Sequence, residues 1–252
     1  GLSAGPIFGG TIKDTFGIQA SFEAMGAACL IGVFLSLLLL PSVKDERINV
    51  KKAIPKKYKD LIRYKSVIGV LIIRYGYMVC VGSFWSFLPL IADSQFGMSS
   101  SAIGILVSAL VLINAVISYP AGVLADISSK RFWVFLGGGF TFAGMLFLYS
   151  SSDVSDLYIV VGLLGIGGGF LTTASTAMSA VIGKKLSATG SVMSLLMAGH
   201  SAGMFTGPLL SGIVMDMTGN PNRAFEMGAV LCLILLIIGY FLTKNFREFD
   251  AV

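Results

Sequence analysis

Residues 1–10 read GLSAGPIFGG, and residues 203–212 read GMFTGPLLSG. Each stretch has glycines four residues apart, a Gly-Pro pair, and a small residue followed by glycine at its end. The match continues, because GPIFGGTIKDTFG at 5–17 corresponds to GPLLSGIVMDMTG at 207–219, and each copy leads through a Phe-Glu pair into another apolar segment. Such self-similarity indicates an internal duplication of a two-helix unit.

The composition of the chain predicts that these helices lie in a membrane. The 252 residues are 55% hydrophobic and only 12% charged, and the mean hydropathy is +0.86. Soluble domains carry about twice that share of charged residues. A helix needs about 20 mostly apolar residues to cross a bilayer. Seven segments meet this length: 21–40, 67–91, 102–125, 132–149, 157–182, 190–215 and 224–243. We therefore predict an all-α, polytopic membrane helix bundle.

The start of the chain resembles the end of an eighth helix. Residues 1–12 are apolar but too short to cross a bilayer, and the first residue is Gly rather than Met. No basic leader precedes the first apolar run, so we expect no signal peptide. We expect the chain to be a fragment, or a truncated product, of a longer protein.

The basic residues predict the orientation of the bundle. Most of them lie in alternate loops, above all in the segment 44–65, whereas the other loops are mainly acidic. Because basic loops stay in the cytoplasm, we expect this segment and the C-terminus to be cytoplasmic in a multi-pass protein of the cell (inner) membrane. The same pattern accounts for the net charge of +5 without a nucleic-acid partner; contact with anionic lipid of the bilayer would be consistent with it. The three cysteines fall inside apolar spans, which argues against a disulfide framework or a metal cluster.

The repeated glycines have a physical role in a membrane helix. Gly203 and Gly207 lie one turn apart and present a face almost without side chains, against which another helix can pack closely. Pro208 removes one backbone hydrogen bond and bends the helix. Two interpretations follow from the spacing alone: a static packing face, or a seal that separates two states of a moving protein.

The first copy also resembles a known motif. Gly1, Gly5, Pro6, Gly9 and Gly10 are similar to the antiporter motif of the major facilitator superfamily, which lies in the fifth of twelve spans; the second copy supplies Gly203, Gly207, Pro208 and Gly212. The resemblance implies that the chain runs from the end of the fifth span through the twelfth. Residues 1–43 would end the N-terminal half, 44–65 would form the basic cytoplasmic central loop, and 66–252 would be the C-terminal six-helix bundle of a two-fold pseudo-symmetric transporter.

A second stretch, GVLADISSKR at 122–131, resembles the loop gating motif of the same family. Gly122, Asp126, Lys130 and Arg131 match the pattern. Ile127 stands where the family has a basic residue, and Ser129 stands where it has glycine. The resemblance implies that Asp126 meets the positive amino end of another helix.

The resemblance further implies a substrate cavity between the two halves, lined here by the spans 67–91 and 157–182. The candidate residues are Arg74, Tyr75, Tyr77 and Trp85 in the first span, and Thr173 and Thr176, on a face shared with Gly162 and Gly169, in the second. The aromatic residues could instead pack or face lipid. The threonines could instead bond their own backbone.

Polar groups inside the bilayer are costly and need a reason. Arg74 either reaches the cavity or extends along the helix to the cytoplasmic surface. His200 either carries protons or binds substrate, or it hydrogen-bonds a neighbouring helix. Asn114 is expected to join two helices by hydrogen bonding.

Motion rather than chemistry is the expected function. The chain has no serine elbow, phosphate loop or metal-ligand spacing, so we predict no enzyme and no cofactor. The family resemblance implies secondary active transport of a small organic solute, as proton-coupled efflux by alternating access, with the missing N-terminal half or a second copy as partner. Two alternatives stay open: an importer in which Arg74 and His200 bind an organic anion, and a seven-span receptor, against which the internal repeat argues.

The orientation expected from the basic loops predicts on which side of the membrane three residues lie. Single cysteines at Lys51→Cys and Lys184→Cys should react only with reagent from the cytoplasmic side, and a cysteine at Asp153→Cys only from the other side. Accessibility labelling with a membrane-impermeant maleimide measures this. Reaction of all three from one side would contradict the span assignment.

Overall fold

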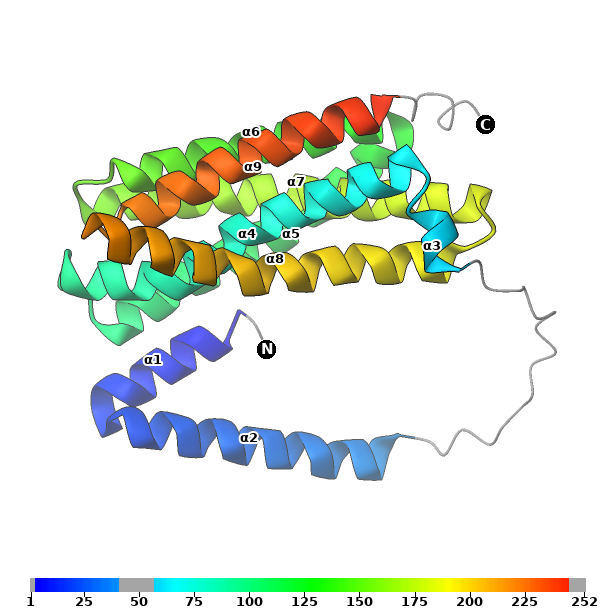
Figure 1. Ribbon diagram of the computed structural model, residues 1–252. Helices are drawn as coiled ribbons and strands as arrows, with labels where there is room; N and C mark the ends of the chain where they lie inside the picture. Colours follow the sequence, from blue (N-terminus) through cyan, green and yellow to red (C-terminus); the bar gives the residue numbers. More distant parts are fainter. Residues whose placement is uncertain (1–2, 41–56, 245–252) are drawn as a thin grey trace.

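The computed structural model describes residues 3–40 and 57–244 of the chain (Figure 1). Gly1 of the predicted motif, residues 44–56 of the predicted central loop and residues 245–252 lie outside the described residues. The described part is helical: α1 (Gly5–Phe16), α2 (Ile18–Leu39), α3 (Tyr58–Leu61), α4 (Lys65–Ser94), α5 (Ser100–Ile127), α6 (Lys130–Tyr149), α7 (Val154–Lys185), α8 (Thr189–Thr218) and α9 (Arg223–Leu242).

Helices α4 to α9 form one bundle with a buried apolar core. Within it α4 packs against α8 and α9, α6 packs against α7 and α9, and α5 packs against α7. Phe84, Met145 and Phe225 are among its largest fully buried side chains. Helices α1 and α2 lie beside this bundle as a hairpin, with α1 against α5 (Figure 1). No residue of α2 is buried, so its apolar surface remains uncovered in the described part of the chain.

The all-α prediction is confirmed, and the predicted spans correspond to long helices. Six of the described helices, α2, α4, α5, α6, α7 and α9, are long and apolar enough to cross a membrane. Helix α8 has 30 residues, the same length as α4, but it is not among these six. Because successive long helices run in opposite directions (Figure 1), the basic residues at the start of α4, the start of α6 and the end of α7 share one end of the bundle.

Sequence signals set the helix ends. The hydroxyl of Ser99 accepts a hydrogen bond from the backbone N–H of Ala102 at the start of α5, and the hydroxyl of Ser129 does the same for Phe132 in α6. The two repeated helices end alike, because α1 is followed by Gly17 at φ 88° and α8 by Gly219 at φ 63°. Glycine adopts such positive φ angles without steric cost.

The glycine face of α8 packs against α4 within the bundle. A methyl group at Gly203 would lie 2.6 Å from Cβ of Met78, and one at Gly207 would lie 3.0 Å from Cα of Val79 and closer still to its carbonyl oxygen. One turn further on, the Ser211 hydroxyl donates a hydrogen bond of 2.6 Å to the Ser83 hydroxyl. In this structure the face is therefore a packing interface between α8 and α4.

This packing predicts an asymmetric response to added methyl groups. Gly207→Ala should lower the free energy of unfolding by about 1–3 kcal/mol, because the α4 backbone must move away. Gly139→Ala on α6, where a methyl group would meet nothing within 4 Å, is the matched control and should leave stability unchanged or raise it by up to about 1 kcal/mol. Thermal unfolding of the purified protein in detergent compares them. Equal behaviour of the two variants would contradict the close contact.

Candidate functional site

Arg74 on α4 is the most deeply buried charged side chain of the described residues. It is 4% exposed, and its Nη2 donates a hydrogen bond of 3.2 Å to the Thr176 hydroxyl on α7. That hydroxyl in turn donates to the carbonyl oxygen of Thr172. Nε and Nη1 of Arg74 have no partner among the described residues. Arg74 therefore points into the bundle rather than extending to the surface, and its charge is only partly compensated there.

Helix α8 borders the same region with two polar side chains. His200 is half-buried and lies near enough to Arg74 for an electrostatic interaction between the two side chains. Its Nδ1 has no hydrogen-bond partner in the described chain. The Thr206 hydroxyl lies 3.0 Å from the hydroxyl of Tyr75 on α4. The structure thus joins Arg74 to α7 through Thr176 and Tyr75 to α8 through Thr206, and it places His200 of α8 near enough to Arg74 for their charges to interact.

Gly168 on α7 makes room for two more of the predicted residues. A methyl group at this position would collide with the Asn114 amide nitrogen from α5 and with the Tyr77 hydroxyl from α4. Two polar side chains, one from α4 and one from α5, therefore lie over one glycine of α7. Asn114 thus lies close to α7, and its side-chain oxygen accepts a hydrogen bond of 3.5 Å from the Ser118 hydroxyl on its own helix.

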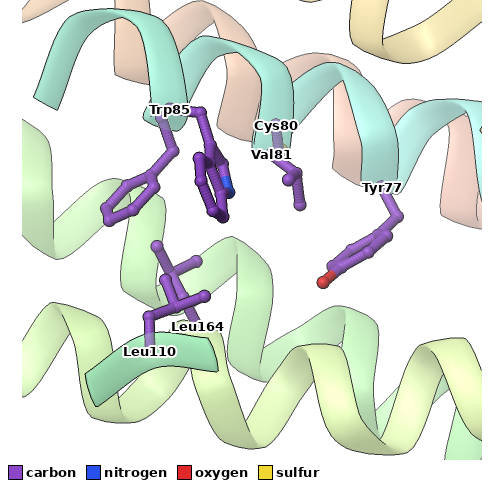
Figure 2. A pocket seen from close by; sticks show the side chains of 7 residues that line it. Tyr77, Cys80, Val81, Trp85, Leu110 and Leu164 are labelled. Atoms are coloured by element: carbon purple, nitrogen blue, oxygen red, sulfur yellow. The ribbon is translucent and has the colours of Figure 1, made fainter. Parts of the chain in front are cut away.

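Helices α4, α5 and α7 also enclose a small cavity of about 30 Å³ (Figure 2). Tyr77 and Trp85 line it from α4, facing Leu110 and Leu164 from the other two helices. Cavities that bind small organic molecules measure roughly 300 Å³ or more. Tyr77 and Trp85 thus face inward, and the space holds one or two water molecules at most.

The predicted open wall on α7 is covered in the structure. Gly169 packs against Ile117 of α5, and Thr173 lies next to Gly122 of the same helix. Only Gly162 of this face has nothing within 4 Å of an added methyl group. Two of the four residues, Gly169 and Thr173, therefore contact α5, while Thr176 accepts a hydrogen bond from Arg74 of α4.

The loop gating residues lie at the junction of α5 and α6. Asp126 is exposed in the last turn of α5, and Lys130 begins α6. Arg131 donates a hydrogen bond of 2.7 Å to the carbonyl oxygen of Tyr240 near the end of α9, and its guanidinium lies 3.8 Å from the centre of the Tyr240 ring. Arg131 therefore holds α6 to α9, a contact that the motif did not indicate.

Comparison with known proteins identifies the family. The sequence profile of the Major Facilitator Superfamily matches residues 67–248. The chain belongs to this superfamily.

Individual relatives agree with the family match. The chain is 28% identical to the MFS-type transporter SLC18B1 of Mus musculus over 92% of its own length and 51% of the relative. It is 25% identical to the multi-drug resistance efflux pump PmrA homolog of Lactococcus lactis over 99% of its length and 61% of the relative. The chain thus spans about half to three-fifths of the length of these curated relatives.

A solved structure supports the superfamily fold. A crystal structure of the peptide transporter POT with sulfate matches at a TM-score of 0.57 and 16% identity, covering 77% of this chain and 42% of the other. At this identity the likeness concerns the fold alone.

The sequence analysis did not single out three residues that the structure shows in contact with candidate residues: Gly168 beside Asn114 and Tyr77, Thr206 beside Tyr75, and Tyr240 beside Arg131. Gly168 stands in the run GIGGG, where the sequence does not tell which glycine approaches another helix. Thr206 lies inside the second copy of the repeat, between two motif glycines, and that position could have directed attention to it.

The arrangement around Gly168 predicts how the site responds to one methyl group. Gly168→Ala should destabilise the protein by about 1–3 kcal/mol, because the Asn114 amide and the Tyr77 hydroxyl must both move. Combining it with Asn114→Ala and Tyr77→Phe should recover most of the loss beyond the cost of those two changes alone. Gly162→Ala on the same helix is the control. Thermal unfolding measures all of these, and additive losses would show that the three residues do not share one space.

Proposed function

We propose that this chain forms the end of the first half and the whole second half of a secondary transporter that exports a small organic solute in exchange for protons. The carrying observation is that a superfamily bundle of six helices encloses Arg74, two of whose three guanidinium nitrogens have no partner among the described residues. A buried charge inside a membrane is expensive and is kept for a function. The relative named as a multi-drug efflux pump supports export.

Alternating access requires a second half, and the proposal includes one. Residues 3–40 contribute the α1–α2 hairpin, whose counterpart in the duplicated sequence is α8–α9. The uncovered surface of α2 is consistent with further helices around it. Rocking of the two halves about a site near the midplane would then carry the solute. The basic helix ends favour an orientation with the C-terminus in the cytoplasm of a cell whose inner membrane holds the protein.

One observation favours a second candidate, the import of an organic anion. Two of the three guanidinium nitrogens of Arg74 have no partner among the described residues, and His200 lies nearby. A carboxylate or phosphate of a solute could occupy those donors. In this case Arg74 and His200 would bind the anion directly, with Thr176 holding the guanidinium in place.

Transport by the full-length gene product that contains this chain tests the proposal. In everted membrane vesicles with an acidic interior, we expect uptake of a neutral or cationic fluorescent solute that stops when an uncoupler collapses the pH gradient. His200→Gln should retain exchange of solute but lose its dependence on the gradient, because the chain holds a single imidazole. Ser201→Ala, at the exposed neighbouring position, is the control.

Three outcomes separate the candidates. An unchanged pH dependence in His200→Gln excludes that residue as the proton carrier. Uptake of an anionic dye in right-side-out vesicles, lost in Arg74→Gln, favours the importer. Rates independent of any pH gradient for every solute contradict proton coupling.

A further inference from the structure

Helices α6 and α9 run side by side (Figure 1), and a groove of about 280 Å³ follows the surface between them. The residues that line most of this α6–α9 groove are Phe135, Gly139 and Phe142 of α6 and Leu233, Ile237 and Tyr240 of α9. The lining contains no charged side chain. The groove is therefore an apolar surface on the outside of the described bundle, where a membrane protein meets lipid or another helix.

Two adjacent glycines of α6 give the groove its shape. A methyl group at Gly138 would collide with the side chain of Leu236, so this glycine allows α9 to approach. A methyl group at Gly139 would meet nothing within 4 Å, so this glycine leaves the space between the two helices unfilled. The groove thus has a closed floor at Gly138 and an open side at Gly139.

Cationic side chains lie at one end of the groove. Arg131 stands one turn before Phe135, and its hydrogen bond to the carbonyl oxygen of Tyr240 places its guanidinium between the two helices. Arg131 forms no ion pair within the described part of the chain, and its Nε has no hydrogen-bond partner there. Lys130 begins α6, and Lys244 follows the end of α9. This end of the groove therefore offers positive charge that no described carboxylate neutralises.

The length of the groove fits one leaflet of a bilayer. From Arg131 to Phe142 the helix rises about 16 Å, at about 1.5 Å per residue. The hydrocarbon core of a bilayer is roughly 30 Å thick, so the groove ends near its middle. A basic group at the membrane surface, followed by an apolar channel that ends at the midplane, matches a phospholipid, whose phosphate lies at the surface and whose chains end at the midplane.

A second groove on the same bundle lacks this charge. It measures about 490 Å³, lies between α8 and α9, and includes Arg223 and Glu226 in its lining. Arg223 donates to the Glu226 carboxylate at 2.5 Å, so its charge is already compensated. An anionic headgroup would meet that carboxylate. The α6–α9 groove is therefore the better match for an anionic lipid.

We propose that the α6–α9 groove holds an acyl chain of an anionic phospholipid from the leaflet at the basic end of the bundle, and that Arg131 binds its phosphate together with Lys130 and Lys244. Arginine and phosphate form charge-assisted hydrogen bonds, which are stronger than neutral ones. The bound lipid contacts α6 and α9 at once and so reinforces the junction that Arg131 and Tyr240 make.

The lipid beside the groove can be measured directly in the full-length gene product that contains this chain. A bimane fluorophore at Ala143→Cys, exposed one turn beyond Gly139, reports it after the exposed cysteines, Cys29 among them, are replaced by serine. The protein is placed in vesicles of phosphatidylglycerol and phosphatidylcholine with identical chains, and one lipid at a time carries bromine on its chains. We expect brominated phosphatidylglycerol to quench the fluorophore more strongly than its share of the vesicle predicts.

Three substitutions locate this preference. Arg131→Gln should lower it about fivefold, the loss expected for one basic side chain near an anionic lipid. Lys130→Gln, which leaves the contact of Arg131 with Tyr240 in place, should lower it by a smaller factor and decides the question if Arg131→Gln fails to fold. Gly139→Phe should lower it without changing any charge, because the ring fills the groove.

Arg223→Gln removes the same charge from the second groove and is the matched control, which should leave the preference unchanged. An equal loss in this control, or equal quenching by both brominated lipids in the parent, overturns the headgroup site. No loss in Gly139→Phe overturns the position of the chain. Absence of quenching by either lipid shows that a second copy or another helix covers the groove. Loss of the preference in excess glycerol 3-phosphate shows a site for free phosphate, and either of these two results overturns the proposal.

Discussion

Close approach of helix backbones is the interaction on which this structure depends. Apolar side chains gain little from leaving lipid for a protein interior, so helices in a membrane associate through packing and hydrogen bonds. Glycines meet this need at each major crossing: Gly207 lets α8 reach the backbone of α4, Gly137 and Gly167 let α6 and α7 meet, and Gly104 lets α5 reach α1. Side chains at these positions would separate the helices and remove the dispersion contacts that hold the bundle together.

The same close packing leaves few places for polar groups, and those places coincide with the candidate site. Arg74 and the residues around it lie where α4, α7 and α8 converge, and Asn114 and Tyr77 share the space above Gly168. Away from this region most buried hydroxyls are satisfied by their own helix, as when the Thr141 hydroxyl donates to the carbonyl oxygen of Gly137. The incompletely bonded Arg74 therefore stands out against a background in which polar groups are bonded locally.

The sequence predicts the number and positions of the long helices well, because twenty apolar residues between charged or turn residues have few other structures available. It does not predict which helix covers which glycine, since the same four-residue spacing occurs on α1 and α8 and their contacts differ. The sequence also does not predict which helices cover the candidate face of α7. In the structure Thr173 faces α5, and Thr176 accepts a hydrogen bond from Arg74 of α4. Helical spacing shows that these residues share a face but not how two neighbouring helices divide it.

The two faces of the repeated helix differ in how easily they can separate. The contact of α8 with α4 is buried and includes the Ser211–Ser83 hydrogen bond, so opening it would expose unpaired hydroxyls to lipid. The contact of α1 with α5 ends in the exposed carboxylate of Asp14, whose hydrogen bonds water can replace when the helices part. In the two-half transporter proposed above, alternation needs contacts of both kinds, permanent ones within a half and reversible ones between the halves. The two copies of the repeat provide one of each in this structure: the covered face of α8 against α4, and the covered face of α1 against α5.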